Sequence, residues 1–475
     1  MVSKQYILKF IFILFMITSF SCSCKKNETN FVEEEFLSYE EGEELLAGKL
    51  TLFSVSQEAF GRPVSTISAS DNFDFGVGNS LFRQAWVTAP ASTTLRDGLG
   101  PLFNSRSCGS CHFKDGRGEP LESEDGSTSK GFLMRISQLG SNLHGEPMGD
   151  PIYGDQFQTF GIAGVNKEGE DTVSWSSKTE TFTDGYSLEL RIPNYQFTDL
   201  QYGSFNGQVL SSPRVGQQVM GLGFLEAISE ATILEFASNQ AISGKVSGKA
   251  NYVWNVEAQK STIGRFGWKA NQPTLKQQIA AAFNGDLGIT SSIFPSDHCS
   301  EYQKNCTDAT NGGVPELRDQ SLNQVVVYTS LLTVPARRNF KEDKVLQGKE
   351  LFRNLECNSC HVEKMTTGTH PTFTELSNIT IRPFTDLLLH DMGEGLADNR
   401  PDFLADGKEW RTQPLWGLGL IESVNNHTFL LHDGRARNIM EAVLWHGGEA
   451  EASKQKVLTL NATQRENLLA FLNSL

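Results

Sequence analysis

The stretch Cys108-Gly109-Ser110-Cys111-His112 decides how the rest of the chain is read, and a second copy stands at Cys357-Asn358-Ser359-Cys360-His361. Each copy has the C-x-x-C-H pattern of c-type haem attachment, in which two thiols form thioethers to the haem and the adjoining imidazole binds its iron. The copies lie 249 residues apart, much farther than the halves of a zinc ribbon, and a redox dithiol requires neither the histidine nor a duplicate. The sequence therefore predicts two covalently bound c-type haems, with Cys108, Cys111, Cys357 and Cys360 as attachment residues and His112 and His361 as iron ligands.

The composition is that of a soluble protein with room for two or three domains: 475 residues, 39% hydrophobic and 20% charged. The formal net charge is −15. Because phosphate binding needs clustered lysine and arginine, we expect no nucleic-acid partner, whereas a small redox protein or cytochrome of basic character is compatible with such a charge.

Residues 1–21 have the features of a bacterial export signal. Two lysines precede or enter an apolar run over residues 6–20, which is too short to span a bilayer comfortably. Cys22 and Cys24 follow, so the segment resembles a lipoprotein signal with lipid on Cys22 or Cys24; a simple signal peptide or an uncleaved anchor is the alternative. We expect an exported protein, periplasmic or held at the outer membrane by an N-terminal lipid anchor.

Export places the remaining cysteines in an oxidising compartment. Cys299 and Cys306 are the only unassigned pair, so a disulfide is a better expectation for them than ligand binding. The acidic stretch over residues 22–75 is interpreted as a tether followed by an edge segment packed on the first domain.

The two motifs predict a mainly α protein with two cytochrome c-like haem domains of unequal size. The N-terminal domain covers residues 76–338 and is enlarged by loops and short strands inserted between about 120 and 260. The C-terminal domain covers residues 339–475.

Helical periodicity predicts how each domain ends and begins. Apolar residues at helical spacing predict a closing helix over residues 319–335 and another at the C terminus, where Thr463 and Glu466 form a capping-box pattern. Phe103 and Phe352 each lie five residues before the first motif cysteine, and both are expected in the helix that leads into the motif.

A second internal correspondence links the segments that start at Trp268 and His432. Counting from these residues, Leu275 and Ile439 stand at +7, Gln278 and Ala442 at +10, and Ala282 and His446 at +14. We treat the two segments as equivalent.

The chain from about residue 75 onward resembles the family named dihaem oxidoreductase, putative peroxidase (formerly "thiol oxidoreductase"), related to bacterial dihaem cytochrome c peroxidase and MauG. The resemblance rests on five strings: residues 97–104 (DGLGPLFN), 264–270 (GRFGWKA), 286–290 (DLGIT), 390–393 (HDMG) and 432–436 (HDGRA).

This resemblance implies different sixth ligands at the two irons. In relatives the C-terminal haem transfers electrons and takes its sixth ligand from the helix after the HDGR string, a position that corresponds to His446 here; Met392 is the alternative ligand. The N-terminal haem, where peroxide reacts in relatives, has Ala282 at this position, which cannot bind iron. His144 is a weaker candidate for a distal ligand at that haem.

The resemblance also implies catalytic residues. Gln278 and Asp286 correspond to pocket residues beside the N-terminal haem, where a carboxylate takes and returns the peroxide proton. The side chain of Asp286 is one methylene shorter than the glutamate of relatives, and Asp286 follows Trp268 by fewer residues than that glutamate follows the corresponding aromatic residue. Trp268 corresponds to an aromatic residue between the haems, on the path of the electrons.

We therefore expect an enzyme, of the dihaem cytochrome c peroxidase type, that reduces hydrogen peroxide at the N-terminal haem with electrons from the C-terminal haem. The alternatives are a non-catalytic periplasmic electron-transfer protein and a MauG-like oxidation of another substrate.

Overall fold

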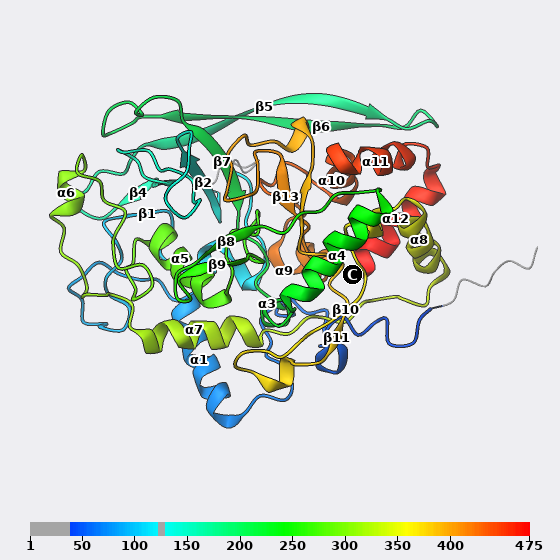
Figure 1. The fold of residues 1–475 in the computed structure, drawn as a ribbon, viewed down its shortest axis with the longest axis horizontal. Coiled ribbons are helices and arrows are strands. Elements are labelled where there is room, and N and C mark those ends of the chain that lie inside the picture. Colours follow the sequence, from blue (N-terminus) through cyan, green and yellow to red (C-terminus); the bar gives the residue numbers. More distant parts are fainter. Residues whose placement is uncertain (1–38, 122–128) are drawn as a thin grey trace, which may run out of the picture. The chain divides into compact units, whose positions relative to one another are not determined.

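The computed structural model describes residues 39–121 and 129–475. Two pairs of packed helices frame the fold, one pair before residue 338 and the other after it; these two parts are called the N-terminal and C-terminal halves below (Figure 1). Helix α1 (Ala69–Arg83) packs on α7 (Asp319–Leu331), and α8 (Asp343–Asn354) packs on α12 (Ala462–Ser474). The predicted signal segment and Cys22 and Cys24 lie outside the described residues. Helices α7 and α12 are the two predicted closing helices.

A glycine brings each pair into close contact. A Cβ atom on Gly78 of α1 would lie 2.0 Å from the carbonyl oxygen of Gln324, and one on Gly348 of α8 would lie 1.9 Å from that of Asn467. Only glycine lets the backbones approach this closely. The two halves of the chain therefore use the same device to hold a leading helix against a closing helix.

The predicted cap of α12 is wrong by two residues. The helix begins after Asn461, whose side chain accepts from the backbone N–H of Gln464 while the Gln464 side chain accepts from the backbone N–H of Asn461. This reciprocal pair satisfies two donors of the first turn, so it displaces the pattern expected from Thr463 and Glu466.

Phe82, rather than Phe103, is the counterpart of Phe352. The ring of Phe82 in α1 lies 6.1 Å from that of His112, and the ring of Phe352 in α8 lies 6.4 Å from that of His361. Phe103 belongs to a short strand instead and stacks on Phe160. The prediction that Phe103 lies in the leading helix is therefore wrong.

The described residues contain 31% helix and 18% strand. The expectation of a mainly α protein is met only in part, because inserted strands take a large share of the N-terminal half. The remaining α-helices are α2 (Cys108–Cys111), α3 (Leu222–Glu226), α4 (Glu230–Ser243), α5 (Leu275–Leu287), α6 (Lys304–Thr307), α9 (Ile421–Asn425), α10 (Ile439–Trp445) and α11 (Glu451–Val457).

Short 3-10 helices occur at Gly48–Leu50, Phe113–Asp115, Cys357–Ser359, Thr374–Leu376, Glu394–Leu396, Leu418–Leu420 and Gly448–Ala450.

The strands form small antiparallel sheets. The largest by strand number has the order β3-β2-β7, and the others are two-stranded, pairing β1 with β4, β5 with β6, β8 with β9, β10 with β11 and β12 with β13. The strands are β1 (Leu102–Phe103), β2 (Phe132–Ser137), β3 (Gln156–Phe157), β4 (Phe160–Gly161), β5 (Glu170–Thr181), β6 (Ser187–Thr198), β7 (Leu210–Val215), β8 (Tyr252–Asn255), β9 (Lys260–Ile263), β10 (Met365–Thr366), β11 (Thr380–Ile381), β12 (Leu389–Asp391) and β13 (Glu409–Arg411).

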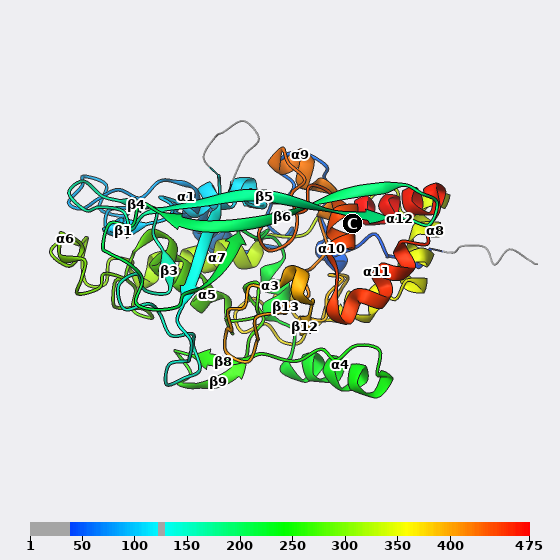
Figure 2. The same cartoon turned by 90° about the horizontal axis from the view of Figure 1, so that it is seen from above.

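The β5–β6 hairpin extends from the N-terminal half to the region of α11 and α12 (Figures 1 and 2). At its turn, Phe182 is 1% exposed, and the guanidinium of Arg465 in α12 lies 4.5 Å from the centroid of its ring. The backbone N–H of Thr183 donates to the carbonyl oxygen of Leu458. The hairpin thus belongs to one half of the sequence and is anchored in the other.

The described residues from Tyr39 onward pack as one unit, without a break in packing near residue 338. The division into domains at residues 76–338 and 339–475 therefore stays a prediction from the repeat. None of the described helices combines the length and apolar character needed to cross a bilayer.

Candidate functional site

The first motif places His112 directly after α2 with one ring nitrogen already bonded. Its Nδ1 lies 2.6 Å from the carbonyl oxygen of Gln217, so Nδ1 carries the proton and donates while Nε2 keeps its lone pair. Burial lowers the pKa of His112, which keeps the ring neutral. A neutral imidazole oriented in this way is the usual form of a histidine metal ligand.

The second motif repeats this arrangement. His361 donates through Nδ1 to the carbonyl oxygen of Phe384 at 2.9 Å, and burial lowers its pKa to about 4. Both motif histidines therefore present a free Nε2, each fixed by a carbonyl group from a loop distant in sequence.

The cysteines divide as predicted. Cys299 and Cys306 form a disulfide, and the other four described cysteines, those of the two motifs, are free thiols. Burial raises the pKa values of all four motif thiols, to about 12 for Cys111 and Cys357. Because a redox dithiol depends on a lowered thiol pKa, these values argue against that use of the C-x-x-C pairs.

A cavity of about 250 Å³, measured as space for water-sized molecules, lies beside the second motif. Its wall is largely apolar, and it brings together residues from both halves of the chain: Arg117, Trp268, His361, Met392, Arg411 and His446. His446 and Met392, the two candidate sixth ligands, thus line the same cavity as His361.

His446 directly follows α10, and its ring is oriented in the same way as those of the motif histidines. Its Nδ1 donates to the carbonyl oxygen of Ala442 at 2.7 Å, and burial lowers its pKa. Its Nε2 is therefore the nitrogen with a free lone pair. Met392 lies two residues beyond His390, at the edge of the cluster described next.

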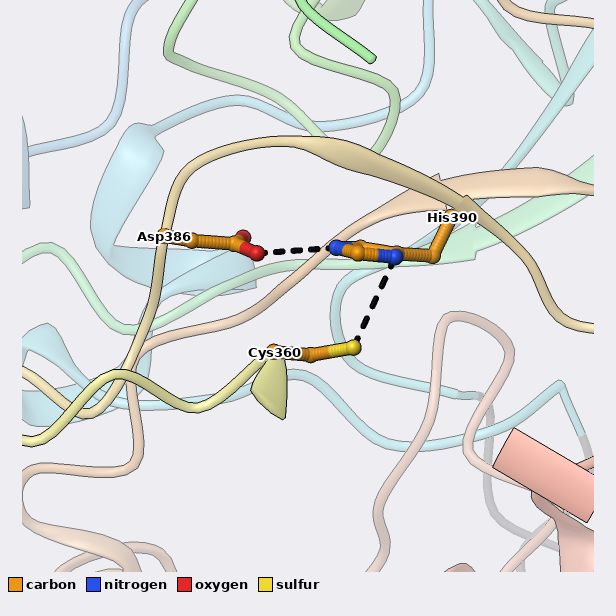
Figure 3. A group of neighbouring side chains, drawn as sticks. All are labelled: Cys360, Asp386 and His390. Carbon is orange, nitrogen blue, oxygen red and sulfur yellow. Dashed lines mark hydrogen bonds and ion pairs between the residues drawn. The ribbon is translucent and has the colours of Figure 1, made fainter. Parts of the chain in front are cut away.

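Cys360, Asp386 and His390 form a cluster behind the second motif (Figure 3), with candidate ligand atoms within 4.8 Å of one another. His390 bonds Asp386 through Nε2 at 2.8 Å and Glu449 through Nδ1 at 2.9 Å, while the Cys360 sulfur lies 3.5 Å from Nδ1. Burial disfavours the charged ring, but the bonds to Asp386, Cys360 and Glu449 raise the pKa of His390 to about 12. Both ring nitrogens are held by carboxylates, so the cluster is a buried ionic network rather than a metal site.

Helix α5 carries Gln278, Ala282 and Asp286 on one stripe, because residues four apart lie on the same face of a helix. Gln278 and Asp286 are about 12 Å apart along the helix axis, with Ala282 between them. The two polar side chains are therefore placed on either side of the small residue and cannot both bond one small molecule.

Asp286 lies close to the first motif. Its Oδ1 accepts from Nε2 of the buried Gln156 at 2.9 Å, and its backbone carbonyl accepts from the N–H groups of Asn104 and Ser105. Burial raises the pKa of its carboxyl, although the charge of Arg135 and the bond from Gln156 oppose the shift. A carboxyl of this kind is suited to hold and release a proton.

The correspondence between the Trp268 and His432 segments is present in the backbone. Antiparallel bridges join Phe266 to Gln272 and Leu430 to Ala436, at −2 and +4 in both segments. The residues at −1 and +2 have positive φ in both: Gly267 and Ala270 in one, Leu431 and Gly434 in the other.

Helices α5 and α10 then begin at +7 in both segments, after the caps Thr274 and Asn438. Ala282 and His446 therefore occupy equivalent positions, although α5 continues past Ala282 whereas α10 ends just before His446.

Trp268 connects the two motif regions. Its indole Nε1 donates to the carbonyl oxygen of Val215 at 2.9 Å, two residues before the Gln217 carbonyl that holds His112. Its ring also lines the cavity of the second motif and meets the edge of His432, which is stacked on Trp410 at 3.8 Å.

Four residues of this region have no counterpart in the sequence predictions. The side chain of Gln217 donates to Oε1 of Gln413 at 2.5 Å, and Arg411 donates to the same atom at 2.9 Å. A chain of hydrogen bonds therefore runs from His112 to Arg411 in the second cavity. Arg117, five residues after His112, also enters that cavity, with its guanidinium 5.2 Å from the centroid of the Trp268 ring. No local sequence pattern signals these contacts.

His144 lies at the surface and stacks on Trp254, with ring centroids 3.8 Å apart. This stacking contact is enough to explain the position of His144, so we assign it no role as a distal iron ligand.

The repeated histidines and thiols and the shared cavity define a protein that uses haem for redox chemistry. The chain belongs to the family described as "Di-haem oxidoreductase, putative peroxidase", whose profile matches residues 43–475. Membership supports an enzyme of the oxidoreductase class.

Among solved structures, hydrazine synthase from Kuenenia stuttgartiensis, pressurised with xenon, aligns with 88% of this chain and 94% of its own at 12% identity and a TM-score of 0.30. No curated protein sequence shows significant similarity to the chain.

The residues at both motifs fit a haem. Each offers two partly buried thiols and a neutral imidazole with a free Nε2, and the second adds an apolar cavity with His446 on its wall. This donor set suits haem iron better than an oxygen-preferring cation.

Proposed function

We propose that the protein is an exported dihaem c-type oxidoreductase that reduces hydrogen peroxide at the first motif with electrons received at the second. The observation that carries this proposal is the asymmetry between two equivalent helices: α10 presents His446 where α5 presents Ala282. One site thus has a side chain able to complete iron coordination, and the other has at the equivalent position only a methyl group, which cannot bind iron.

Covalent attachment through Cys108 and Cys111 and through Cys357 and Cys360, with His112 and His361 as ligands, is part of the proposal. A haem iron with an open coordination position supplies peroxide binding and one-electron transfer when bound. The work of this chain's residues is to orient the cofactor, move protons and connect the two sites.

Asp286 is the proposed acid and base. Because Gln156 holds its Oδ1, its Oδ2 is the atom that takes a proton from the incoming peroxide and returns it to the leaving oxygen. One turnover consumes a peroxide molecule, two electrons and two protons and releases two molecules of water. Gln278, on the other side of Ala282, cannot bond the same molecule at the same time as Asp286, so it is proposed to bond peroxide as it enters, before the molecule reaches Asp286.

Trp268 is the proposed connection for electrons. It lines the cavity of the second motif, and its indole N–H is held by the loop whose next residues hold His112. A fixed aromatic ring in this place shortens the path through space between the two sites.

The proposal also includes export with lipid on Cys22 or Cys24, and a small redox protein or cytochrome as electron donor. The acidic net charge supports a basic partner and disfavours nucleic acid.

The test is electron paramagnetic resonance of the purified holoprotein, oxidised and half-reduced, together with peroxide turnover using a reduced cytochrome as donor. We expect one haem with two histidine ligands, one haem with an open position, and steady turnover. Two fully coordinated haems at every redox poise without turnover would indicate an electron-transfer protein, and a stable protein-oxidising state after one equivalent of peroxide would indicate MauG-like chemistry.

A further inference from the structure

Arg117 and Arg411 are buried cations without a carboxylate partner. They are 6% and 5% exposed, and among the described residues neither lies within ion-pair distance of an aspartate or glutamate. Burying an unpaired charge costs several kcal/mol, so a fold that keeps two of them in one place calls for a counter-charge.

Their protein partners are neutral. Arg117 donates to the carbonyl oxygens of Phe429 and Leu431, at 3.2 and 2.5 Å. Arg411 donates to the carbonyl oxygens of Gly267 and Thr412 and to the amide of Gln413. These bonds fix the direction of each guanidinium but supply no ion pair. The charge of Asp433 attracts Arg117 and that of Asp386 attracts Arg411, both from beyond ion-pair distance. Each of these carboxylates is already bonded to another cationic side chain, Asp433 to Arg435 and Asp386 to His390.

Other buried arginines in the described chain do form ion pairs with carboxylates. Arg214 and Arg400 pair with Asp402, Arg337 pairs with Glu43, and Arg435 pairs with Asp433. Arg265, like Arg117 and Arg411, lacks an ion pair, but its guanidinium donates to the carbonyl oxygens of three residues between Leu225 and Ile228, and it does not line the cavity.

Both unpaired arginines line the cavity of the second motif and converge on Trp268 from opposite halves of the chain. Arg117 lies over the indole ring, and the backbone N–H of Arg411 donates to the carbonyl oxygen of Trp268 at 2.9 Å. A haem attached at Cys357 and Cys360 carries two propionate carboxylates, which match the two arginines in number and in charge.

We propose that Arg117 and Arg411 bind the two propionates of the second haem and so direct its propionate edge toward Trp268. This inference rests on the proposed presence of a haem at the second motif. It assigns to a residue five positions after His112 a role at the other haem, so the first motif contributes directly to the second site.

The readout is the midpoint potential of each haem, measured by spectroelectrochemical titration of the holoprotein. An arginine that neutralises a propionate stabilises the ferrous haem, so its loss favours the ferric form. We expect Arg117→Met and Arg411→Met to lower the same one of the two midpoints and to leave the other unchanged. A tenfold fall in the ratio of reduced to oxidised haem at a fixed poise corresponds to about 59 mV for one electron.

Arg117→Lys and Arg411→Lys keep the charge and should restore most of each shift, and Arg265→Met is the matched control because it removes a buried arginine outside the cavity. Mass spectrometry establishes that each variant carries two haems; where a methionine variant loses haem, the glutamine variant, which also removes the charge but keeps a polar side chain, is compared with wild type instead. Unchanged midpoints, shifts in two different haems, or an equal shift in Arg265→Met would overturn the proposal.

Failure of the proposed function gives a different result. Absence of peroxide turnover by the wild-type protein contradicts the peroxidase assignment but leaves the expected shifts in potential intact. Normal turnover with unchanged midpoints contradicts the propionate assignment alone.

Discussion

His446 donates through Nδ1 to the carbonyl oxygen of Ala442, 2.7 Å away and one turn earlier in the chain. The same tautomer is fixed at His112 and His361 by carbonyl groups from distant loops. Three histidines therefore present Nε2, and two of them do so toward one cavity.

Replacing His446 with methionine should raise the midpoint potential of the second haem, because a thioether ligand raises the potential relative to a second imidazole. His446→Ala should instead remove the low-spin signal with two imidazole ligands from the electron paramagnetic resonance spectrum. His144→Ala is the control, since it removes an exposed ring that is stacked on Trp254. An unaltered spectrum in His446→Ala would transfer the ligand role to Met392.

Asp286→Asn should reduce peroxide turnover by about 10² to 10⁴-fold, the usual contribution of a positioned acid or base, with both haems retained. Asp286→Glu should recover part of the activity, because it restores the carboxyl group. Turnover under saturating donor is the measurement, and Glu235→Gln on the exposed face of α4 is the control. Wild-type turnover in Asp286→Asn would exclude the residue from proton transfer.

Glu168 should make the folded state less stable as the pH rises. It is 1% exposed, and burial raises the pKa of its carboxyl from 4.5 to about 8, against the bonds that it accepts from Gln158 and Gln303. The folded state therefore binds more protons than the unfolded state between these values. The stabilising contribution is complete below about pH 4.5 and is lost by about pH 8, at a cost of at most about 5 kcal/mol.

Urea unfolding at pH 5.5 and pH 8.5 measures this effect. In Glu168→Gln, which stays uncharged, the free energy of unfolding should fall less over that interval than in wild type. One amide N–H₂ in the variant faces a donor, so a constant loss of about 1 kcal/mol is expected at both pH values. Equal pH dependence in both proteins would contradict the shifted carboxyl.

Two glycines in α1 should respond to alanine in opposite directions. Gly78→Ala places a methyl group against the Gln324 carbonyl of α7 and should destabilise the protein by about 1 to 3 kcal/mol or more. Gly76→Ala has no atom within 4 Å of the new Cβ and should stabilise by about 0.5 to 1 kcal/mol through helix propensity. Urea midpoints of the two variants check this. A loss of stability in both variants would show that α1 itself tolerates no alanine at these positions, whether or not the new methyl group meets α7.

Some of this architecture was accessible from the sequence, because the information is local. The offset of +7 from Trp268 and His432 predicts where α5 and α10 correspond, since turn and cap residues act within a few positions. Counting back from the cysteines misplaces Phe103, because it assumes that both leading helices connect to their motifs through segments of equal length. The repeated string Gly-x-x-Leu-Phe at residues 78–82 and 348–352 marks the correct pair.

Arg117 and Arg411 could not be found in this way. Each stands in an unremarkable local context, and their convergence on Trp268 depends on how segments nearly 300 residues apart are packed. A buried arginine without an ion pair is a property of the folded cavity, so only the three-dimensional structure can identify it.

The anchoring of the β5–β6 hairpin also sets an order of events during synthesis. Its turn is held by Leu458 and Arg465, the latter 281 residues after its partner Asp184, so the hairpin leaves the ribosome long before its binding site exists. Phe182 therefore stays uncovered until the residues from Leu458 to Arg465 have been made. Removal of α12 should therefore first destabilise the turn of a hairpin whose Asp184 lies 281 residues before Arg465.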